Sequence, residues 1–276
     1  TPSAAPTAAP SQAPTAAPSD KPAPAPSDKP SETPKPQPSE EPDPYDPNQK
    51  LDLQLENSDS DSEAYAKPSI PTVSDNEYTL MWSDNFKGTE LNRNDWNVET
   101  HDAGWVNAES QAYVDDEKNI YVEDGNLILR PIRQKNADGT ETITSGRVNT
   151  QGKHDFTYGL FEVRAKVPTG KGFLPAFWMM PTDENLYGQW PRCGEIDAME
   201  VMGQENNKLY GTIHYGNPHS EKQGTYTLEN GNFTDEYHTF ACDWEPGKIS
   251  WYVDVVKYHE ANDWYSTTEG QGTVAY

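Results

Sequence analysis

The sequence predicts an all-β sandwich over residues 76–276, preceded by a disordered linker over residues 1–75. Many short runs rich in aromatic and β-branched residues follow one another, and turn signals separate them at regular spacing. No stretch shows the apolar period of a long helix. The roughly 200 residues after the linker are enough for one domain with a sizeable core.

The linker is predicted from its composition. Of the 24 prolines, 15 fall within the first 50 residues, and the heptapeptide at residues 5–11 recurs at residues 13–19. Such sequence favours extended polyproline II and serves as a semi-rigid spacer. Residues 51–75 are acidic and rich in Ser, which continues the disorder. Two interpretations remain open: a spacer to an upstream carbohydrate-binding or surface-anchoring module, or a tail without a specific role.

The formal net charge of −24 makes nucleic acid and anionic membrane surfaces unfavourable partners. The longest apolar run, near residues 173–181, is far too short to span a bilayer. These features fit a secreted, extracellular and monomeric protein that acts on a neutral substrate.

The expected strands follow in chain order. The alternation of apolar and polar residues at 161–167 predicts a half-buried strand, and the solid apolar run at 173–180 predicts a fully buried one. Asp124-Gly125 predicts a hairpin turn, and a second turn is expected at residues 245–248. The full set of expected strands covers residues 78–82, 119–122, 126–130, 160–167, 173–180, 194–201, 209–215, 239–244 and 249–254.

Three carboxylates within residues 194–201 make up the main candidate site. Glu195 and Asp197 are two residues apart, so on a strand they share a face. Glu200 would point the other way unless a β-bulge between Asp197 and Glu200 inserts one extra residue. The sequence therefore predicts a bulged strand with all three carboxylates on one face.

Scattered acidic residues usually form a solvated face, but these lie in an apolar run, where mutual repulsion raises their pKa values. Carboxylate-based catalysis requires one glutamate to stay ionised as nucleophile and the other to be protonated as acid. Asp197 can help to separate their pKa values. Side chains leaning together across the bulge would approach the roughly 5–5.5 Å carboxyl separation of a retaining glycosidase. We therefore favour a catalytic role for Glu195, Asp197 and Glu200.

The other candidates carry weaker signals. Trp105 and Trp190 lie in polar, loop-like surroundings that suit exposed platforms for sugar rings, whereas a core position is at least as consistent for Trp178, Trp244 and Trp251. On an extended segment Asn107, Glu109 and Gln111 would share a face and bind sugar hydroxyls, or simply form a polar outer face. Arg147 and His214 are single residues without a pattern of their own.

Several kinds of site lack support in the sequence. Cys193 and Cys242 are interpreted as two small buried residues, although one disulfide is an alternative. The sequence contains no metalloprotease, P-loop or serine-hydrolase motif.

Taken together, the motifs resemble glycoside hydrolase family 16. The block WPRCGEIDAME at residues 190–200 is similar to the signature of its laminarinase-like branch, in which the form Glu-x-Asp-x-x-Glu includes the bulge. Further blocks that resemble the family lie at residues 104–111, 145–150, 158–165, 175–178, 211–215 and 251–254.

The resemblance implies a β-jelly-roll (concanavalin A-like) sandwich and retaining endo-hydrolysis of β-1,3-glucan, with mixed-linkage β-1,3-1,4-glucan as a further substrate. It implies that Glu195 is the nucleophile, Glu200 the acid/base and Asp197 their orienting partner. Residues that the family pattern places along the substrate cleft are Trp105, Asn107, Arg147, Trp190 and His214.

The resemblance further implies no cofactor for catalysis and a structural calcium ion, with a backbone ligand near Gly125. Leu174 stands where many relatives have Trp, which is expected to loosen one stacking contact. The family pattern continues for several strands beyond residue 276, so the chain by itself is expected to be inactive or poorly stable.

Two other function classes remain to be weighed. A non-catalytic β-glucan-binding or lectin-like module would use the same fold but would not need all three carboxylates. The second alternative is a hydrolase of agarose or carrageenan. A sulfated substrate would call for basic residues in the cleft, and this chain is strongly acidic.

Overall fold

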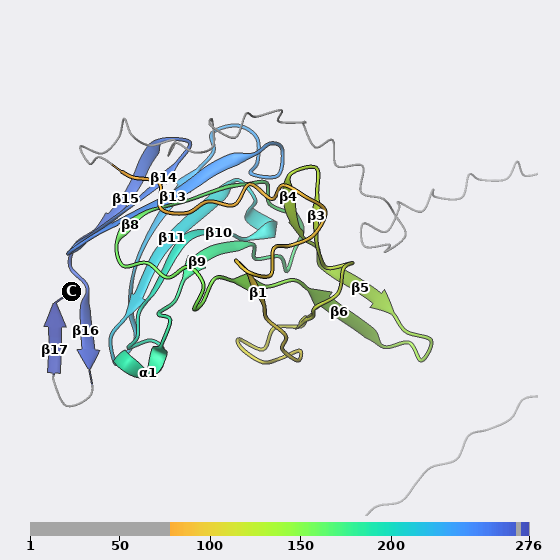
Figure 1. Cartoon of the computed structure of the whole chain (residues 1–276), viewed down its shortest axis with the longest axis horizontal. Helices are drawn as coiled ribbons and strands as arrows, with labels where there is room; N and C mark the ends of the chain where they lie inside the picture. Colours follow the sequence, from red (N-terminus) through yellow and green to blue (C-terminus); the bar gives the residue numbers. More distant parts are fainter. Residues whose placement is uncertain (1–77, 269–271, 276) are drawn as a thin grey trace, which may run out of the picture. The chain divides into compact units, whose positions relative to one another are not determined.

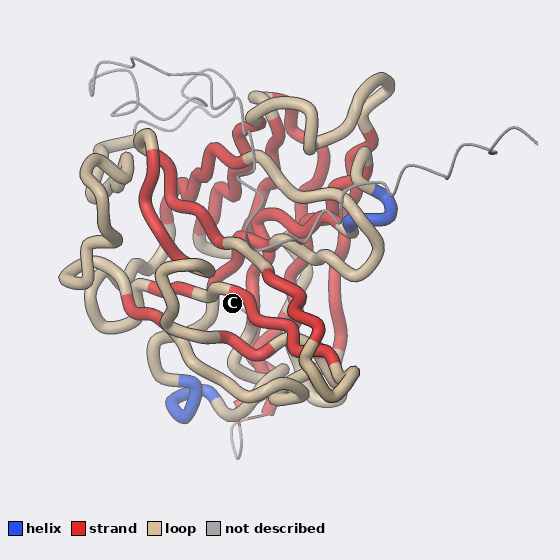
Figure 2. The backbone as a smooth tube through the Cα atoms, turned by 90° about the vertical axis from the view of Figure 1, so that its right-hand side faces the viewer, coloured by secondary structure: helices blue, strands red, loops and turns tan. Residues whose placement is uncertain are grey.

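The computed structural model describes residues 78–268 and 272–275. The linker predicted for residues 1–75 lies outside the described residues. Strands dominate the described chain, and the helical segments are one turn each: α1 (Glu184–Tyr187) and the 3-10 helix η1 (Gly203–Glu205) (Figure 2). Neither has the length and apolar character needed to cross a membrane, and no other helix of the described residues does. The all-β prediction is confirmed.

Two antiparallel four-stranded sheets form the sandwich (Figure 1). The first, which we call the site sheet, has the order β12-β11-β10-β9. Its strands are β9 (Ala176–Met179), β10 (Glu195–Val201), β11 (Lys208–Tyr215) and β12 (Ser220–Thr227). The second, the supporting sheet, has the order β15-β14-β13-β8. Its strands are β8 (Gly159–Ala165), β13 (His238–Glu245), β14 (Lys248–Val253) and β15 (Val256–Ala261).

Smaller pairings complete the described chain. β2 and β6 pair in parallel, whereas the other small pairings are antiparallel. The paired sets are β1 (Asn97–Val98) with β7 (Val148–Asn149), β3 (Ile120–Glu123) with β4 (Asn126–Leu129), β2 (Ala112–Tyr113) with β6 (Glu141–Ser145) and β5 (Ile132–Lys135), and β16 (Tyr265–Thr268) with β17 (Gly272–Ala275).

The core lies between the two main sheets. Ile196 and Ile213 of the site sheet pack in one cluster with Ile249 and Trp251 of the supporting sheet, and all four are buried. Cys193 and Cys242 are buried free thiols, as predicted. Because the supporting sheet covers one face of β10 and β11, only their other face can form a site.

A pair of glycines lets the two sheets approach closely. Gly211 on β11 lies opposite Gly224 on β12. A Cβ atom on Gly211 would overlap the Trp251 indole and the Tyr258 hydroxyl, and one on Gly224 would overlap the His259 ring. Trp251 and His259 stack with their ring centroids 4.7 Å apart. The glycines therefore make room for this stack beneath the site sheet.

We expect Gly211→Ala to lower the free energy of unfolding by about 1–3 kcal/mol, because the added methyl group overpacks a filled contact. Urea unfolding measures the change. Thr225→Ala, on the exposed side of neighbouring β12, is the control and should change stability by no more than about 0.5 kcal/mol. If both variants are equally stable, the close approach of the sheets does not depend on Gly211.

Most of the expected strands are present. The hairpin around Asp124-Gly125 forms between β3 and β4, and the turn at residues 245–248 joins β13 to β14. The expected strands at 160–167 and 209–215 correspond to β8 and β11.

Two strand predictions are wrong. Residues 78–82 form no strand. The run at 173–180 is a strand only from Ala176 to Met179, and it is half-exposed rather than fully buried. Because β9 lies at the edge of the site sheet, one of its faces is covered by the core and the other borders the site.

Strand β12 was not predicted from the sequence. Its residues are almost all polar, with exposed and half-buried side chains alternating along the strand. As an edge strand it contributes little to the core, so an apolar signal is missing.

Candidate active site

Strand β10 points two successive residues into the core. Ile196 and Ala198 belong to one buried cluster, and Met199 and Val201 belong to its neighbour. Strict alternation would bring every second residue inward, but Ala198 and Met199 are both inward. The pairing with β11 shifts register between Asp197 and Glu200 at this point. The predicted β-bulge is therefore confirmed.

The bulge leaves Glu195, Asp197 and Glu200 on the face of the site sheet that is turned away from the core. The side chains of Glu195 and Glu200 are half-buried, and Asp197 is only 2% exposed. The neighbouring strands support this face, because Trp178 of β9 and Thr212 of β11 lie directly opposite Asp197. The sequence prediction that the three carboxylates share one face agrees with this placement.

Burial raises the pKa values of both glutamates. Burial, followed by the charge of Asp197, raises the pKa of Glu195 to about 7 and that of Glu200 to about 7. The charge of His214 works in the opposite direction on both. Both pKa values lie near neutrality, so near pH 7 a state with one glutamate protonated and the other ionised is accessible, as acid and nucleophile require.

His214 joins the carboxylates on this face. It lies on β11 directly opposite Glu195, and its Nε2 is 3.2 Å from Asp197 Oδ2. Burial lowers the pKa of His214, but the facing carboxylates of Asp197 and Glu195 outweigh it and raise the pKa above its usual value. The structure thus brings His214 to the carboxylates.

Trp190 contacts Glu195 from the loop before β10. Its indole Nε1–H donates a hydrogen bond of 2.5 Å to Glu195 Oε2, and the side chain is 47% exposed. Hydrogen bonding from Trp190 lowers the pKa of Glu195, which partly offsets burial. An exposed ring beside a carboxylate fits the predicted sugar platform.

A second cluster gathers around Arg147. The guanidinium lies 4.6 Å from the ring centre of Trp178 and 5.2 Å from that of Trp105. It forms an ion pair with Glu99, with Arg147 Nε 2.9 Å from Glu99 Oε2. Because Trp178 is the cross-strand neighbour of Asp197, this aromatic cluster adjoins the carboxylates. The structure therefore brings the predicted residues Trp105 and Arg147 together beside the site.

Glu99 is held ionised in this cluster. Burial raises its pKa, but hydrogen bonds from Asn149 and His101 and the charge of Arg147 lower the pKa below its usual value overall. The ion pair thus orients Arg147 across the ring faces of Trp105 and Trp178.

The prediction for Asn107 needs correction. Asn107 and Ala108 have φ angles of 51° and 54°, so residues 107–111 are not one extended segment. Hydrogen bonds from Gly104 N to Glu109 O and from Glu109 N to Val106 O close a turn here. Asn107 is exposed in this turn and does not share a strand face with Glu109 and Gln111, both of which hydrogen-bond with Tyr113.

Two further residues of the site, Trp178 and Glu99, could not be assigned to it from the sequence. Trp178 was as consistent with the core as with a site, because its strand is apolar throughout. Glu99 was not a candidate, because it lies far from Arg147 in sequence and carries no motif. Trp244 packs against the core and Trp251 is buried within it.

The expected calcium ion would lie near Gly125. Gly125 lies in the β3–β4 turn, and the carbonyl oxygen of Asn85 is 3.9 Å from the position of a Cβ on Gly125. The one group of three or more His, Cys, Asp or Glu side chains close enough to hold a metal ion, within residues 78–268 and 272–275, lies elsewhere. The calcium ion remains a prediction.

Comparison with known proteins identifies the family. The sequence model of Glycosyl hydrolases family 16 matches residues 95–271, well over half of the chain. The chain belongs to this family. The fold predicted by the resemblance, a β-jelly-roll sandwich, is thereby confirmed.

Two relatives of this chain are named as glucan endo-1,3-beta-glucosidases. The chain is 36% identical over 229 residues to Glucan endo-1,3-beta-glucosidase A1 of Niallia circulans, covering 76% of this chain and 33% of that protein. It is 39% identical over 189 residues to Glucan endo-1,3-beta-glucosidase of Cryptopygus antarcticus, covering 66% and 68%. The family 16 chain therefore spans a third of one relative's length and about two thirds of the other's.

A solved family 16 structure shares the fold. The laminarinase catalytic domain of Thermotoga maritima MSB8 superposes with a TM-score of 0.59 at 36% sequence identity, covering 67% of this chain and 78% of that one. The bulged carboxylate strand lies within residues 95–271, which the family model matches.

Proposed function

We propose that the protein is a retaining endo-hydrolase of β-1,3-glucan that also cuts mixed-linkage β-1,3-1,4-glucan. The observation that carries this proposal is the bulge in β10, which leaves Glu195, Asp197 and Glu200 on one half-buried face. Relatives named as endo-1,3-beta-glucosidases support the substrate class. The three carboxylates lie beside aromatic rings, and this concentration of negative charge favours a neutral polysaccharide over a sulfated one.

In the proposed reaction, Glu195 attacks the anomeric carbon while Glu200 donates its proton to the departing glycosidic oxygen. The new bond joins Glu195 to the sugar as an ester, and the glycosidic bond breaks. Glu200, now ionised, takes a proton from water, and the resulting hydroxide displaces Glu195. Two displacements at one carbon retain its configuration.

The neighbouring residues would keep the two glutamates in their roles. Asp197, two residues along the same strand face, would orient Glu195, and His214 would balance the negative charge of the cluster. Trp190 would hold Glu195 through its indole N–H and present a ring face to a sugar. Arg147, Trp105 and Trp178 would line the adjoining part of the cleft.

Product analysis tests the reaction. On laminarin we expect a ladder of oligosaccharides, and proton NMR at early times should show the β-anomer first. Hydrolysis by this chain and by each variant is measured under one set of conditions. Binding of laminarin without hydrolysis would favour a lectin-like module, and an α-anomer appearing first would exclude the retaining mechanism.

The pH dependence follows from the raised pKa values. We expect a bell-shaped profile of kcat/KM with its maximum near pH 7, because one glutamate must be ionised and the other protonated, and each has a pKa of about 7. Trp190→Phe removes the indole N–H, which should raise the pKa of Glu195 and move the acidic limb to higher pH. Trp105→Phe is the control and should leave that limb in place. An unshifted limb in Trp190→Phe would show that the hydrogen bond does not control ionisation.

We further propose that the protein is secreted, since its acidic, Pro-rich N-terminal segment resembles extracellular spacers. We also propose that it acts as a monomer. Detection of the protein in the culture medium, and its elution volume in size-exclusion chromatography, test these two points.

A further inference from the structure

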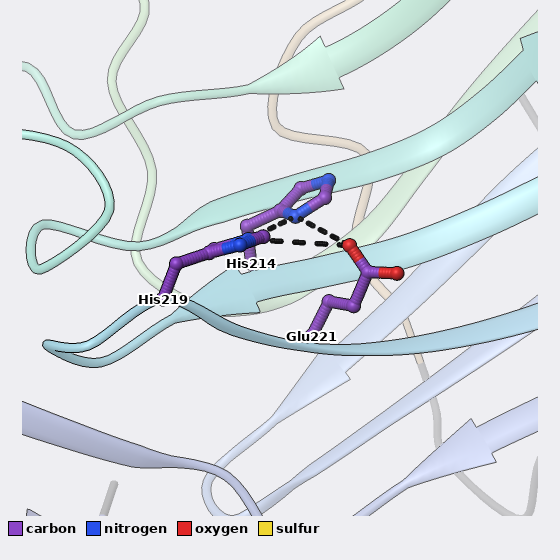
Figure 3. A group of neighbouring side chains, drawn as sticks. All are labelled: His214, His219 and Glu221. Atoms are coloured by element: carbon purple, nitrogen blue, oxygen red, sulfur yellow. Dashed lines mark hydrogen bonds and ion pairs between the residues drawn. The ribbon is translucent and has the colours of Figure 1, made fainter.

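Three potential metal ligands converge at the hairpin between β11 and β12 (Figure 3). His214 on β11 and Glu221 on β12 lie directly opposite each other in the antiparallel pair. His219 comes from the connection between the two strands and points back toward them. The hairpin register itself therefore positions all three side chains.

Their ligand atoms have the spacing of one coordination sphere. His214 Nδ1 lies 3.0 Å from His219 Nε2 and 3.4 Å from Glu221 Oε2, and the latter two atoms are 3.9 Å apart. A tetrahedral ion with bonds of roughly 2.0–2.1 Å separates its ligand atoms by about 3.3 Å. The three distances bracket this value, so small rotamer adjustments would complete three corners of a tetrahedron.

The choice of ligands points to a particular class of metal. Two imidazoles and one carboxylate suit zinc and similar transition metals, whereas calcium and magnesium prefer shells of oxygen. His219 and Glu221 are 39% and 47% exposed, so an ion can enter from solvent and keep a water as fourth ligand. Within the described residues, no other group of His, Cys, Asp and Glu side chains meets this spacing.

We propose that His214, His219 and Glu221 bind one divalent transition-metal ion of the zinc class. The ion would occupy Nδ1 of His214, while Nε2 of the same ring faces Asp197 at 3.2 Å. It would also lie beside Trp190, whose ring centre is 5.0 Å from that of His219. The site is thus one imidazole ring away from the carboxylates, although the binding proposal stands on its own geometry.

The alternative is a hydrogen-bonded pair without metal, in which one proton lies between the two imidazoles and the nearby Glu221 carboxylate balances their charge. Calorimetric titration with zinc chloride distinguishes the two. It uses protein free of affinity tags and stripped with EDTA. We expect one zinc ion per chain and much weaker heats with calcium or magnesium.

Ligand variants locate the ion. His219→Ala and Glu221→Gln should each weaken zinc binding by more than about tenfold, the smallest loss typical of even an outer-shell partner. Glu229→Gln, an exposed glutamate just after β12, is the matched control and should bind as the parent does. Circular dichroism and melting check that each variant is folded, and zinc should raise the Tm of the parent and of Glu229→Gln.

Two results would overturn the proposal: no zinc binding by the parent at millimolar concentration, or binding that is unchanged in both ligand variants. A hydrolysis assay adds a second readout. Zinc should inhibit the parent and Glu229→Gln, and excess EDTA should restore the rate, whereas His219→Ala should resist inhibition. If the protein hydrolyses no glucan, the calorimetric result still decides whether the metal site exists.

Discussion

Glu195→Gln is expected to lower kcat for laminarin on the order of 10⁴-fold or more while leaving glucan binding intact. The amide is nearly isosteric with the carboxylate but cannot form the glycosyl ester, so the loss falls on chemistry rather than on binding. The hydrogen bond from Trp190 can still be accepted by the amide oxygen, which preserves the local geometry. Initial rates and calorimetric binding of laminarin oligosaccharides measure the two effects separately.

Glu200→Gln separates the two glutamates by role. It should also abolish laminarin hydrolysis, but it should still cleave an aryl glucoside whose phenol leaves without protonation. Glu195→Gln should cleave neither substrate. Exposed Glu229→Gln is the matched control and should retain the parent rate. Near-normal hydrolysis by Glu195→Gln would contradict its assignment as nucleophile.

Trp251→Ala is expected to have the largest effect on stability, a loss of about 3–5 kcal/mol in the free energy of unfolding. Trp251 is fully buried between the sheets, and its Nε1–H donates a 2.8 Å hydrogen bond to the backbone carbonyl of Asp197. Truncation opens a cavity and leaves that carbonyl without its donor. Since domains are stable by only about 5–15 kcal/mol, urea unfolding should show a large decrease.

Two variants test how this loss arises. Trp251→Phe retains most of the packing but removes the N–H donor, so about 1–3 kcal/mol should be lost. Trp105→Ala makes the same chemical change as Trp251→Ala at a ring that is 47% exposed, and should leave stability within about 0.5 kcal/mol of the parent. Equal stability of Trp251→Ala and Trp105→Ala would show that Trp251 does not hold the sheets together.

The all-β fold class and the bulged strand with its three carboxylates could be predicted because both depend on local patterns of residues. In residues 195–201 the apolar side chains and the carboxylates each break alternation at the same place, and only a bulge accommodates both. The hairpin at Asp124-Gly125 was equally predictable, because the turn residues act on their immediate neighbours.

The predictions that failed concern contacts that the pattern of residue types does not show. Strand β12 is polar, and only its pairing with β11 makes it a strand. Asn107 was predicted on an extended segment, but hydrogen bonds within residues 104–109 hold a turn there. Trp178 could not be assigned from its apolar surroundings, because its role depends on which face of β9 the supporting sheet leaves uncovered.

By itself, the sequence determined the all-β class, the bulged strand and the identity of its three carboxylates, since side-chain periodicity along a strand is a local property. Only the tertiary structure decided that Trp190 and His214 contact those carboxylates, that Arg147 gathers with Glu99 and Trp178, and that His219 and Glu221 join His214. These contacts depend on strand register and on the packing of two sheets, which bring together residues that no local pattern relates.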